Sequence, residues 1–204
     1  MRLPQKMQIP SVEIQVLSPT RKGELGTVNL NKRLQEVLNP AAKEKKEKAF
    51  GDAIFREGDR VMQIRNNYDI LWHNAYNSAA GLGIFNGDIG CITQIDPDGE
   101  TLTVDFDGRI AQYGFDSLLE LEHAWAMTVH KAQGSEYRAV ILSLGNSAPM
   151  LMTRDVLYTA VTRAKELLIL VGDEEVAHRM VDNYRPSKRY CALRLRLRSL
   201  CGVG

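Results

Sequence analysis

The sequence predicts an α/β domain whose mostly parallel sheet is interrupted by a small β-rich insertion. Apolar runs of strand length occur at residues 12–17, 124–128, 139–144 and 167–171. Residues 51–118 have a different pattern, because their apolar segments are short and turn residues separate them. A sheet built from the two ends of the chain, with the middle inserted between its first and second strands, explains both patterns.

Composition limits the classes of protein that fit this chain. With 204 residues, 44% of them hydrophobic, it holds one large or two small domains with a true core. The net charge of +1 creates no overall field for nucleic acid, so any basic surface must be local. No apolar run has the length of a membrane span, and the three cysteines share no metal-like spacing. We therefore expect a cytoplasmic protein without a membrane segment or a metal site.

The first predicted strand runs from Val12 to Ser18 and stops at Pro19. Arg21 and Lys22 follow it directly, and a solvated loop explains this pair when it is taken alone. Helical spacing predicts a helix over residues 28–38, which Pro40 ends. The mixed-charge run at residues 41–50 is expected to be a helix end or a linker.

The insertion is predicted to be a small barrel or half-barrel. Its turn signals are the dipeptides Asn86-Gly87, Asp98-Gly99 and Asp107-Gly108. The segments expected to supply its short strands are Asp59–Arg65, Ile84–Asp96, Thr101–Asp107 and Arg109–Gly114.

Residues 66–83 are too irregular for a strand and are expected to form a long loop. This segment carries Tyr68 and Trp72. Exposed aromatic rings stack on bases in nucleic-acid-binding proteins. Large rings also fill the cores of small barrels. The sequence leaves these two interpretations open.

The C-terminal third returns to the α/β pattern. Helices are predicted at residues 153–165 and 173–183, with Thr153 and Asp173 as N-caps. Arg163 should lie on the first of these helices, one turn after Thr159 and near the carboxyl ends of the sheet. The basic stretch from residue 185 onward is interpreted as an amphipathic element, with phosphate binding as the less favoured alternative.

The segment from Ala124 to Gly134 concentrates polar residues after a strand. In open α/β sheets, ligands bind in the crevice outside the carboxyl ends of the strands. Gly134 would let the backbone approach a ligand closely. The polar side chains offered there are Thr128, His130, Lys131 and Gln133.

These strings resemble a known family. TVHKAQGSEYRAVIL resembles the fifth motif of superfamily 1 DNA helicases, and LYTAVTRAK their sixth. VLSPTRKGELGTVNLNKRLQEVLNP is similar to the fourth motif of the RecD-like branch, and FREGDRVMQIRNNYD with IFNGDIG to its inserted SH3-like barrel. The resemblance implies a RecA-like parallel sheet, the second motor domain, at residues 1–49 and 120–204. The barrel would be residues 50–119.

The resemblance also implies roles at a nucleotide site between two RecA-like domains. Arg163 would be the arginine finger, and Arg21 would also reach the γ-phosphate. Gln133, Gly134 and Glu136 would link the nucleotide to the DNA, with Glu136 near the ribose. ATP and Mg²⁺ would be held mainly by an N-terminal RecA-like domain of the same parent chain. Cations suit this chemistry, because they neutralise charge on the transferring phosphoryl group.

Single-stranded DNA is the partner that the resemblance implies. Thr128 and His130 would contact it, with Tyr68 and Trp72 as stacking candidates. Translocation would run 5′ to 3′, as in the RecD-like branch. The parent would be of the exodeoxyribonuclease V alpha subunit type, acting in DNA recombination and repair with possible nuclease subunits.

A phosphate-binding loop is missing. No G-x-x-x-x-G-K-[ST] motif occurs in the sequence, nor does the dipeptide Gly-Lys. The chain is therefore expected to be the C-terminal part of a longer helicase and inactive alone. The alternatives are a non-enzymatic module that binds nucleic acid or protein, and a helicase domain associated with a conjugative relaxase. A phosphate-loop sequence encoded upstream of Met1 would support the motor, and a natural start codon at Met1 would support the module.

Overall fold

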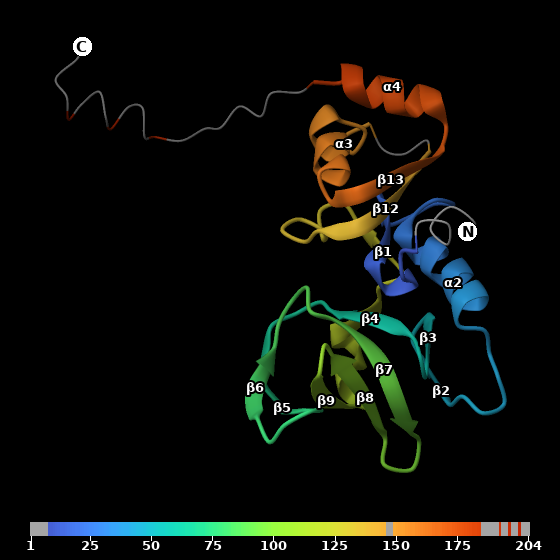
Figure 1. The fold of residues 1–204 in the computed structure, drawn as a ribbon, viewed down its shortest axis with the longest axis vertical. Helices are drawn as coiled ribbons and strands as arrows, with labels where there is room; N and C mark the ends of the chain where they lie inside the picture. The colour runs from blue at the N-terminus through green and yellow to red at the C-terminus, as the bar shows by residue number, and fades with distance from the viewer. Residues whose placement is uncertain (1–7, 146–148, 185–191, 193–195, 197–199, 201–204) are drawn as a thin grey trace.

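The computed structural model describes residues 8–145 and 149–184, together with residues 192, 196 and 200. It has an α/β part and a β part, which lie one above the other in Figure 1. The predicted amphipathic element at the C-terminus lies almost entirely outside the described residues. Among the described residues, no helix is long and apolar enough to cross a membrane.

The α/β part is built on a four-stranded parallel sheet, as predicted. Its order is β11-β1-β12-β13. The apolar runs of the sequence form these strands because both faces of the central ones are covered. The strands are β1 (Ile14–Ser18), β11 (Ala126–Thr128), β12 (Tyr137–Leu144) and β13 (Ala164–Gly172).

Three helices and a short 3₁₀ segment surround this sheet. Helices α3 (Arg154–Val161) and α4 (Glu174–Asp182) pack against one face, where Leu142, Ala160 and Met180 are fully buried. Helix α2 (Thr27–Leu38) lies beside β11, where Asn31 exchanges hydrogen bonds with the backbone of Ala126. The segment η1 (Ser11–Glu13) leads into β1.

Helix α3 is shorter than the sequence predicted. Thr153 caps it as expected and accepts a hydrogen bond from the Val156 backbone. The predicted end at residue 165 is wrong, because the helix stops at Val161 and β13 begins at Ala164. Pairing of Ala164 with Tyr137 in the sheet takes these residues from the helix. The predicted Asp173 cap of α4 is confirmed by its bond to the Glu175 backbone.

The β part contains a seven-stranded antiparallel sheet in the order β10-β4-β7-β8-β9-β5-β6. Its core of buried apolar residues includes Phe55, Phe106 and Tyr113. The short helix η2 (Phe115–Glu120) leads into the last strand. The strands are β4 (Arg60–Gln63), β5 (Asn67–Asn74), β6 (Ala80–Ile84), β7 (Ile89–Asp96), β8 (Thr101–Phe106), β9 (Arg109–Gly114) and β10 (Leu121–His123).

The long loop predicted at residues 66–83 is wrong, because this segment forms the hairpin β5–β6. Its pairing shifts between Asn67 and Leu71, so the alternation that marks a strand is broken in the sequence. Within β5, Ile70 and Trp72 still point to the barrel core and pack against it. This segment forms a strand because these side chains pack against the core, and not because of a local sequence pattern.

The turn predictions have mixed outcomes. Asp107 and Gly108, with φ of +54° and +84°, join the paired strands β8 and β9, as expected of a hairpin. Asn86-Gly87 is a turn, since the Asp88 backbone bonds to the Phe85 carbonyl. It joins β6 to β7, which are not neighbours in the sheet, so the hairpin expected at this turn is wrong.

Residues 47–56 form a second small sheet, although residues 41–50 were expected to be a helix end or linker. Strands β2 (Glu47–Phe50) and β3 (Ala53–Arg56) pair in an antiparallel hairpin. The buried Arg56 side chain bonds to Glu47 at 2.6 Å, and the Lys48 ammonium lies 3.9 Å from the centre of the Phe115 ring. The charged side chains of Glu47 and Lys48, which the sequence pattern predicts to be solvated, therefore take part in tertiary contacts.

A buried carboxylate joins the two parts of the molecule. Asp59 is fully buried and accepts hydrogen bonds from Gln35 of α2 and from Asn39, the residue directly after this helix, at 2.5 and 2.8 Å. It also accepts one from the Arg56 backbone at 2.8 Å and lies 3.1 Å from His123 Nε2. These bonds link α2, the β3–β4 turn and β10, so they fix the orientation of the barrel.

Candidate nucleotide and nucleic-acid interface

The strands of the parallel sheet all end on one side, here called the carboxyl edge, and all begin on the opposite side, here called the amino edge. The predicted site residues divide between these two sides. Ser18 and Thr128 pair at the carboxyl edge, where β1 and β11 end. Tyr137 and Ala164 pair at the amino edge, where β12 and β13 begin. Leu142, five residues after Tyr137, pairs with β1. At 3.3 Å per residue, this offset alone separates the two edges by about 16 Å.

Thr128 and His130 lie at the carboxyl edge. The Thr128 hydroxyl accepts a hydrogen bond from the Lys131 backbone at 3.3 Å. The Val129 backbone donates to the Ser18 carbonyl at 3.0 Å, which holds the start of the following loop against β1. His130 is exposed and Thr128 half-buried, so both side chains are accessible to a ligand at this edge.

Arg21 lies at the same edge, in the loop that follows β1. Its guanidinium donates to Glu122 at 2.7 Å, and the Lys131 ammonium donates to the other oxygen of Glu122, also at 2.7 Å. The structure therefore brings Arg21 together with Lys131 and Glu122, and it does not bring Arg21 to Arg163.

The loop of residues 129–136, here called the crossing loop, connects the two edges. Ala132 anchors it in the core and is fully buried. Gln133 and Gly134 are exposed. Gly134 has φ of +86°, which favours glycine, and a Cβ built there would meet no atom within 4 Å. The space that a ligand would need above this backbone is therefore open.

Arg163 lies at the amino edge, and this corrects its predicted place. It follows the C-cap of α3 instead of lying on the helix, and it is far from the carboxyl ends. The crossover helix returns the chain to the amino edge before β13 begins. The half-buried side chain donates to the Ser135 carbonyl at 2.9 Å and to the Thr159 carbonyl at 3.2 Å.

Two further residues lie at the amino edge. Glu136 is exposed and forms an ion pair with Lys165 at 3.0 Å. Tyr137 donates its backbone N–H to the Arg163 carbonyl at 2.9 Å. Burial raises the pKa of the Tyr137 hydroxyl, and Ser135, Arg60 and Arg163 partly oppose this effect. The ring is therefore neutral at pH 7 and packs as part of the core beside Arg163.

The two aromatic candidates have different environments. Tyr68 is 64% exposed and meets Phe85 edge-on, with ring centroids 5.6 Å apart. Trp72 is half-buried, packs on the barrel core and covers Gly81, where an added Cβ would lie 2.6 Å from the indole. The packing supports the core interpretation for Trp72, whereas the exposed ring of Tyr68 stays a candidate for stacking.

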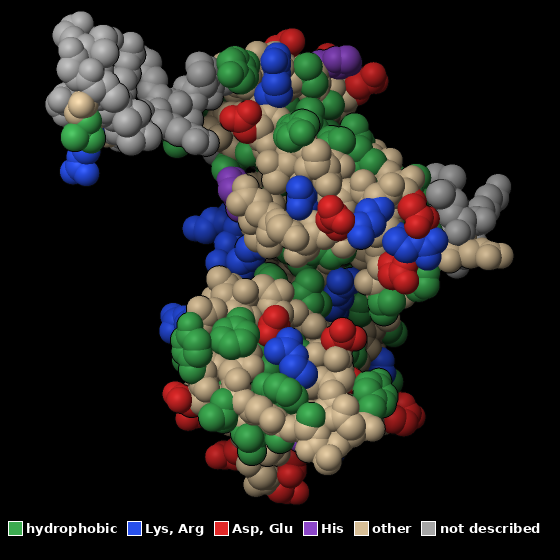
Figure 2. Space-filling view, turned by 60° about the vertical axis from the view of Figure 1, so that its left-hand side comes forward, with side chains coloured by type: hydrophobic (Ala, Val, Ile, Leu, Met, Phe, Trp, Pro, Cys, Tyr) green, Lys and Arg blue, Asp and Glu red, His purple; other side chains and the backbone are tan. Residues whose placement is uncertain are grey.

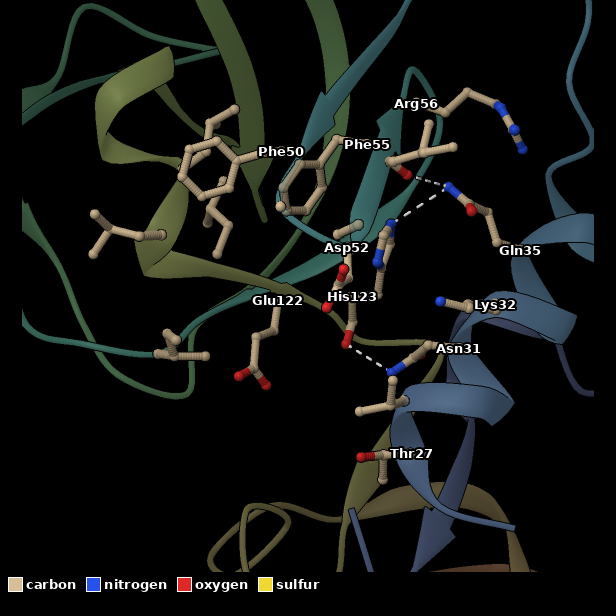
Figure 3. A pocket seen from close by; sticks show the side chains of 18 of the residues that line it. Thr27, Asn31, Lys32, Gln35, Phe50, Asp52, Phe55, Arg56, Glu122 and His123 are labelled. Carbon is tan, nitrogen blue, oxygen red and sulfur yellow. Dashed lines mark hydrogen bonds between the residues drawn. The ribbon is translucent and has the colours of Figure 1, made fainter. Parts of the chain in front are cut away.

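Sequence reasoning missed a cavity at the junction of the two parts. It has a volume of about 770 Å³ and lies between α2, the β2–β3 hairpin and β10 (Figure 3). Arg21, Lys32 and Glu122 contribute charged groups to its lining, and Ile54 and Leu119 contribute apolar ones. Its residues come from segments far apart in the chain, so no local pattern could reveal it. On the face seen in Figure 2, Lys and Arg side chains gather in the narrow zone between the two parts.

Two family models match the chain. One describes the SH3 domain of ATP-dependent RecD-like DNA helicases and matches residues 30–106. The other describes a UvrD-like helicase C-terminal domain and matches residues 123–171. Together with the parallel sheet and the second, antiparallel one, these matches define an α/β helicase fold with an SH3-like insertion.

Similar proteins indicate which group of helicases the chain resembles. The chain is 38% identical over 159 residues to the ATP-dependent RecD2 DNA helicase of Deinococcus radiodurans, covering 78% of this chain and 20% of that protein. It is 31% identical over 186 residues to the RecBCD enzyme subunit RecD of Mycolicibacterium smegmatis, covering 91% and 29%. It therefore spans less than a third of either relative. The chain belongs to the RecD-like DNA helicases and corresponds to their C-terminal region.

Solved structures share the fold. A crystal structure of Pif1 helicase from Bacteroides, in complex with ADP-AlF3 and ssDNA, matches with a TM-score of 0.53 at 18% identity. The match covers 93% of this chain and 46% of that one. At this level of identity the likeness concerns the fold.

Proposed function

We propose that this chain is the C-terminal motor half of an ATP-dependent DNA helicase that moves 5′ to 3′ along single-stranded DNA. Residues 1–49 and 120–204 would form the second RecA-like domain, and residues 50–119 the SH3-like barrel. The N-terminal RecA-like domain of the same parent chain would hold most of the ATP and Mg²⁺. We place the parent in the cytoplasm, which the three cysteines without a metal-like spacing fit, and recombination or nuclease subunits could accompany it there.

The crossing loop is the observation that carries this proposal. It begins directly after Thr128 on the carboxyl edge and ends directly before Tyr137 on the amino edge, where Arg163 binds the Ser135 carbonyl. A motor needs a physical connection between its DNA track and its nucleotide site, and this loop touches both predicted sites.

Arg163 would act on the nucleotide through its charge. All three guanidinium nitrogens now donate to oxygens of the protein itself, namely those of Thr159, Ser135 and Thr162. On domain closure, the γ-phosphate would replace the Ser135 carbonyl as a partner, since an anion is the stronger acceptor. The planar cation would then neutralise charge that develops during phosphoryl transfer.

The exchange would also release the crossing loop. Once the Ser135 carbonyl has lost its bond to Arg163, the end of the loop that carries Gln133, Gly134 and Glu136 can move. The other end of the loop carries His130 and follows Thr128 of β11, and these two residues would contact the DNA. Nucleotide state would in this way change the grip on single-stranded DNA, with Tyr68 of the barrel as a further stacking contact.

Substitution of Gly134 tests this coupling in the full-length helicase. The Cβ that Gly134→Val adds would meet no atom within 4 Å, but a β-branched residue disfavours φ of +86°, so the loop must change its path. We expect ATPase activity without DNA to stay within about twofold, while its stimulation by single-stranded DNA falls by about tenfold, roughly 1.4 kcal/mol of coupling. Gly87→Val, at φ of +100° in a barrel turn, is the matched control. Full stimulation of Gly134→Val would exclude the loop as the connection.

A further inference from the structure

A single carboxylate stands between two cations at the carboxyl edge of the sheet. Glu122 accepts the Arg21 guanidinium on one oxygen and the Lys131 ammonium on the other, both at 2.7 Å. The side chains of Arg21, Glu122 and Lys131 are 62%, 28% and 33% exposed. The group carries one net positive charge and is open to solvent.

The three residues come from separate elements. Arg21 follows β1, Lys131 belongs to the crossing loop, and Glu122 is the middle residue of β10, which pairs with β4 of the barrel sheet. In Figure 3 the Glu122 side chain points away from His123 on the same strand, and its carboxylate, which Arg21 and Lys131 bind, is partly exposed to solvent. A ligand can therefore reach this carboxylate without displacing the core.

The arrangement at Glu122, with one cation on each of two oxygens of the same anion, would also suit a phosphate group. Guanidinium and ammonium donors bind carboxylate and phosphate oxygens in the same way, and phosphate takes both at once. Thr128, which is predicted to contact DNA, bonds directly to the Lys131 backbone. Arg21 lies at this edge, away from Arg163, so a phosphate on the DNA side is the ligand within its reach.

We propose that Arg21 and Lys131 form a phosphate-binding site, which Glu122 fills as an internal anion until a backbone phosphate of single-stranded DNA replaces it. This proposal rests on the proposed function for its ligand. Glu122 lowers the affinity for DNA, because each binding event must first break two ion pairs. Exposed ion pairs are weak, so the exchange is readily reversible.

The test compares the 204-residue chain with its Glu122→Gln variant in binding to a fluorescent oligo(dT), by anisotropy over a series of NaCl concentrations. The amide keeps the shape of the side chain and removes its charge. We expect Glu122→Gln to bind about three- to tenfold more tightly at low salt. The log–log salt slope should steepen by about 0.7 for each additional phosphate that the variant neutralises. Arg21→Gln in addition should abolish the tighter binding.

Glu24→Gln is the matched control, because it removes the same charge from the loop of Arg21. The described structure shows no ion pair at Glu24, which is exposed. Its affinity should stay within about twofold of the starting chain. Circular dichroism spectra of all variants verify that each is folded.

The outcomes separate the two proposals. Unchanged or weaker binding by folded Glu122→Gln would show that Glu122 positions the cations, and would overturn the phosphate site while leaving the helicase assignment intact. No binding by any variant would overturn both the phosphate site and the DNA track. An increase in affinity for ATP, measured in parallel, without an increase for oligo(dT) would overturn the assignment to DNA.

Discussion

At the scale of residues, Asp59 shows how one buried group can orient two substructures. Its carboxylate accepts hydrogen bonds from Gln35 of α2, from Asn39 directly after α2 and from the Arg56 backbone of β3, and it lies 3.1 Å from His123 of β10. No sequence pattern marks this residue, because its partners are 20 or more residues away along the chain except Arg56. Such a buried acceptor is expensive to remove, since the donors around it lose their partner in a site that water does not reach.

Replacing Asp59 with Ala should destabilise the chain by about 3 kcal/mol, because several buried donors become unsatisfied at once. Urea denaturation followed by circular dichroism measures the change in the free energy of unfolding. Asp98→Ala, in the exposed turn between β7 and β8, should shift it by less than about 0.5 kcal/mol. An equal effect of the two substitutions would contradict the structural role of Asp59.

At the scale of elements, apolar runs were sufficient to predict the four parallel strands and the helices that cover them. They failed where tertiary contacts decide the structure. The hairpin β5–β6 was hidden by a shift of register, and β2–β3 by charges that are satisfied by Arg56 and Phe115. The end of α3 was misplaced because pairing of β13 overrides the helical pattern.

The barrel should lose stability in alkali through Tyr113. Burial, followed by Glu120 and Asp88, raises the pKa of its hydroxyl, which donates to Gln63 at 2.9 Å. A folded-state pKa above the unfolded value of about 10 gives stability that is present below pH 10 and is lost as the pH rises further.

The measurement is the urea midpoint at pH 8 and at pH 11 for the chain and for Tyr113→Phe. The variant should lose about 1 kcal/mol at pH 8, because the Gln63 oxygen loses its donor. Between pH 8 and pH 11 the variant should lose less further stability than the unmodified chain. Some loss should remain, because the pKa of Tyr137 is also raised and this residue is present in both proteins. Parallel losses in the two proteins would exclude Tyr113 as the source.

At the scale of the whole molecule, the motifs were sufficient to predict the family and the parallel sheet with its inserted barrel. They were insufficient to place Arg21 and Arg163 at opposite edges, because motif order along the chain does not give the path of the crossing loop. The cation pair around Glu122 and the junction cavity arise from segments that meet only in the folded chain.

The chain alone should not hydrolyse ATP, because the sequence lacks a phosphate-binding loop. Phosphate release by the purified 204-residue chain should equal the background without protein. Turnover that rises in proportion to chain concentration and disappears in Arg163→Ala would show that the nucleotide site is complete within this chain.

Single-turnover ATP hydrolysis by the full-length helicase, compared between Arg163→Ala and Arg138→Ala, tests the central claim most directly. Arg138 is also at the amino edge, but it is held by Glu13 and Glu166 on the surface. We predict that Arg163→Ala lowers the rate by about 10³-fold, roughly 4 kcal/mol of barrier, with nucleotide affinity changed much less. Arg138→Ala should stay within about twofold. Near-normal hydrolysis by folded Arg163→Ala would contradict the assignment of this arginine to the nucleotide site.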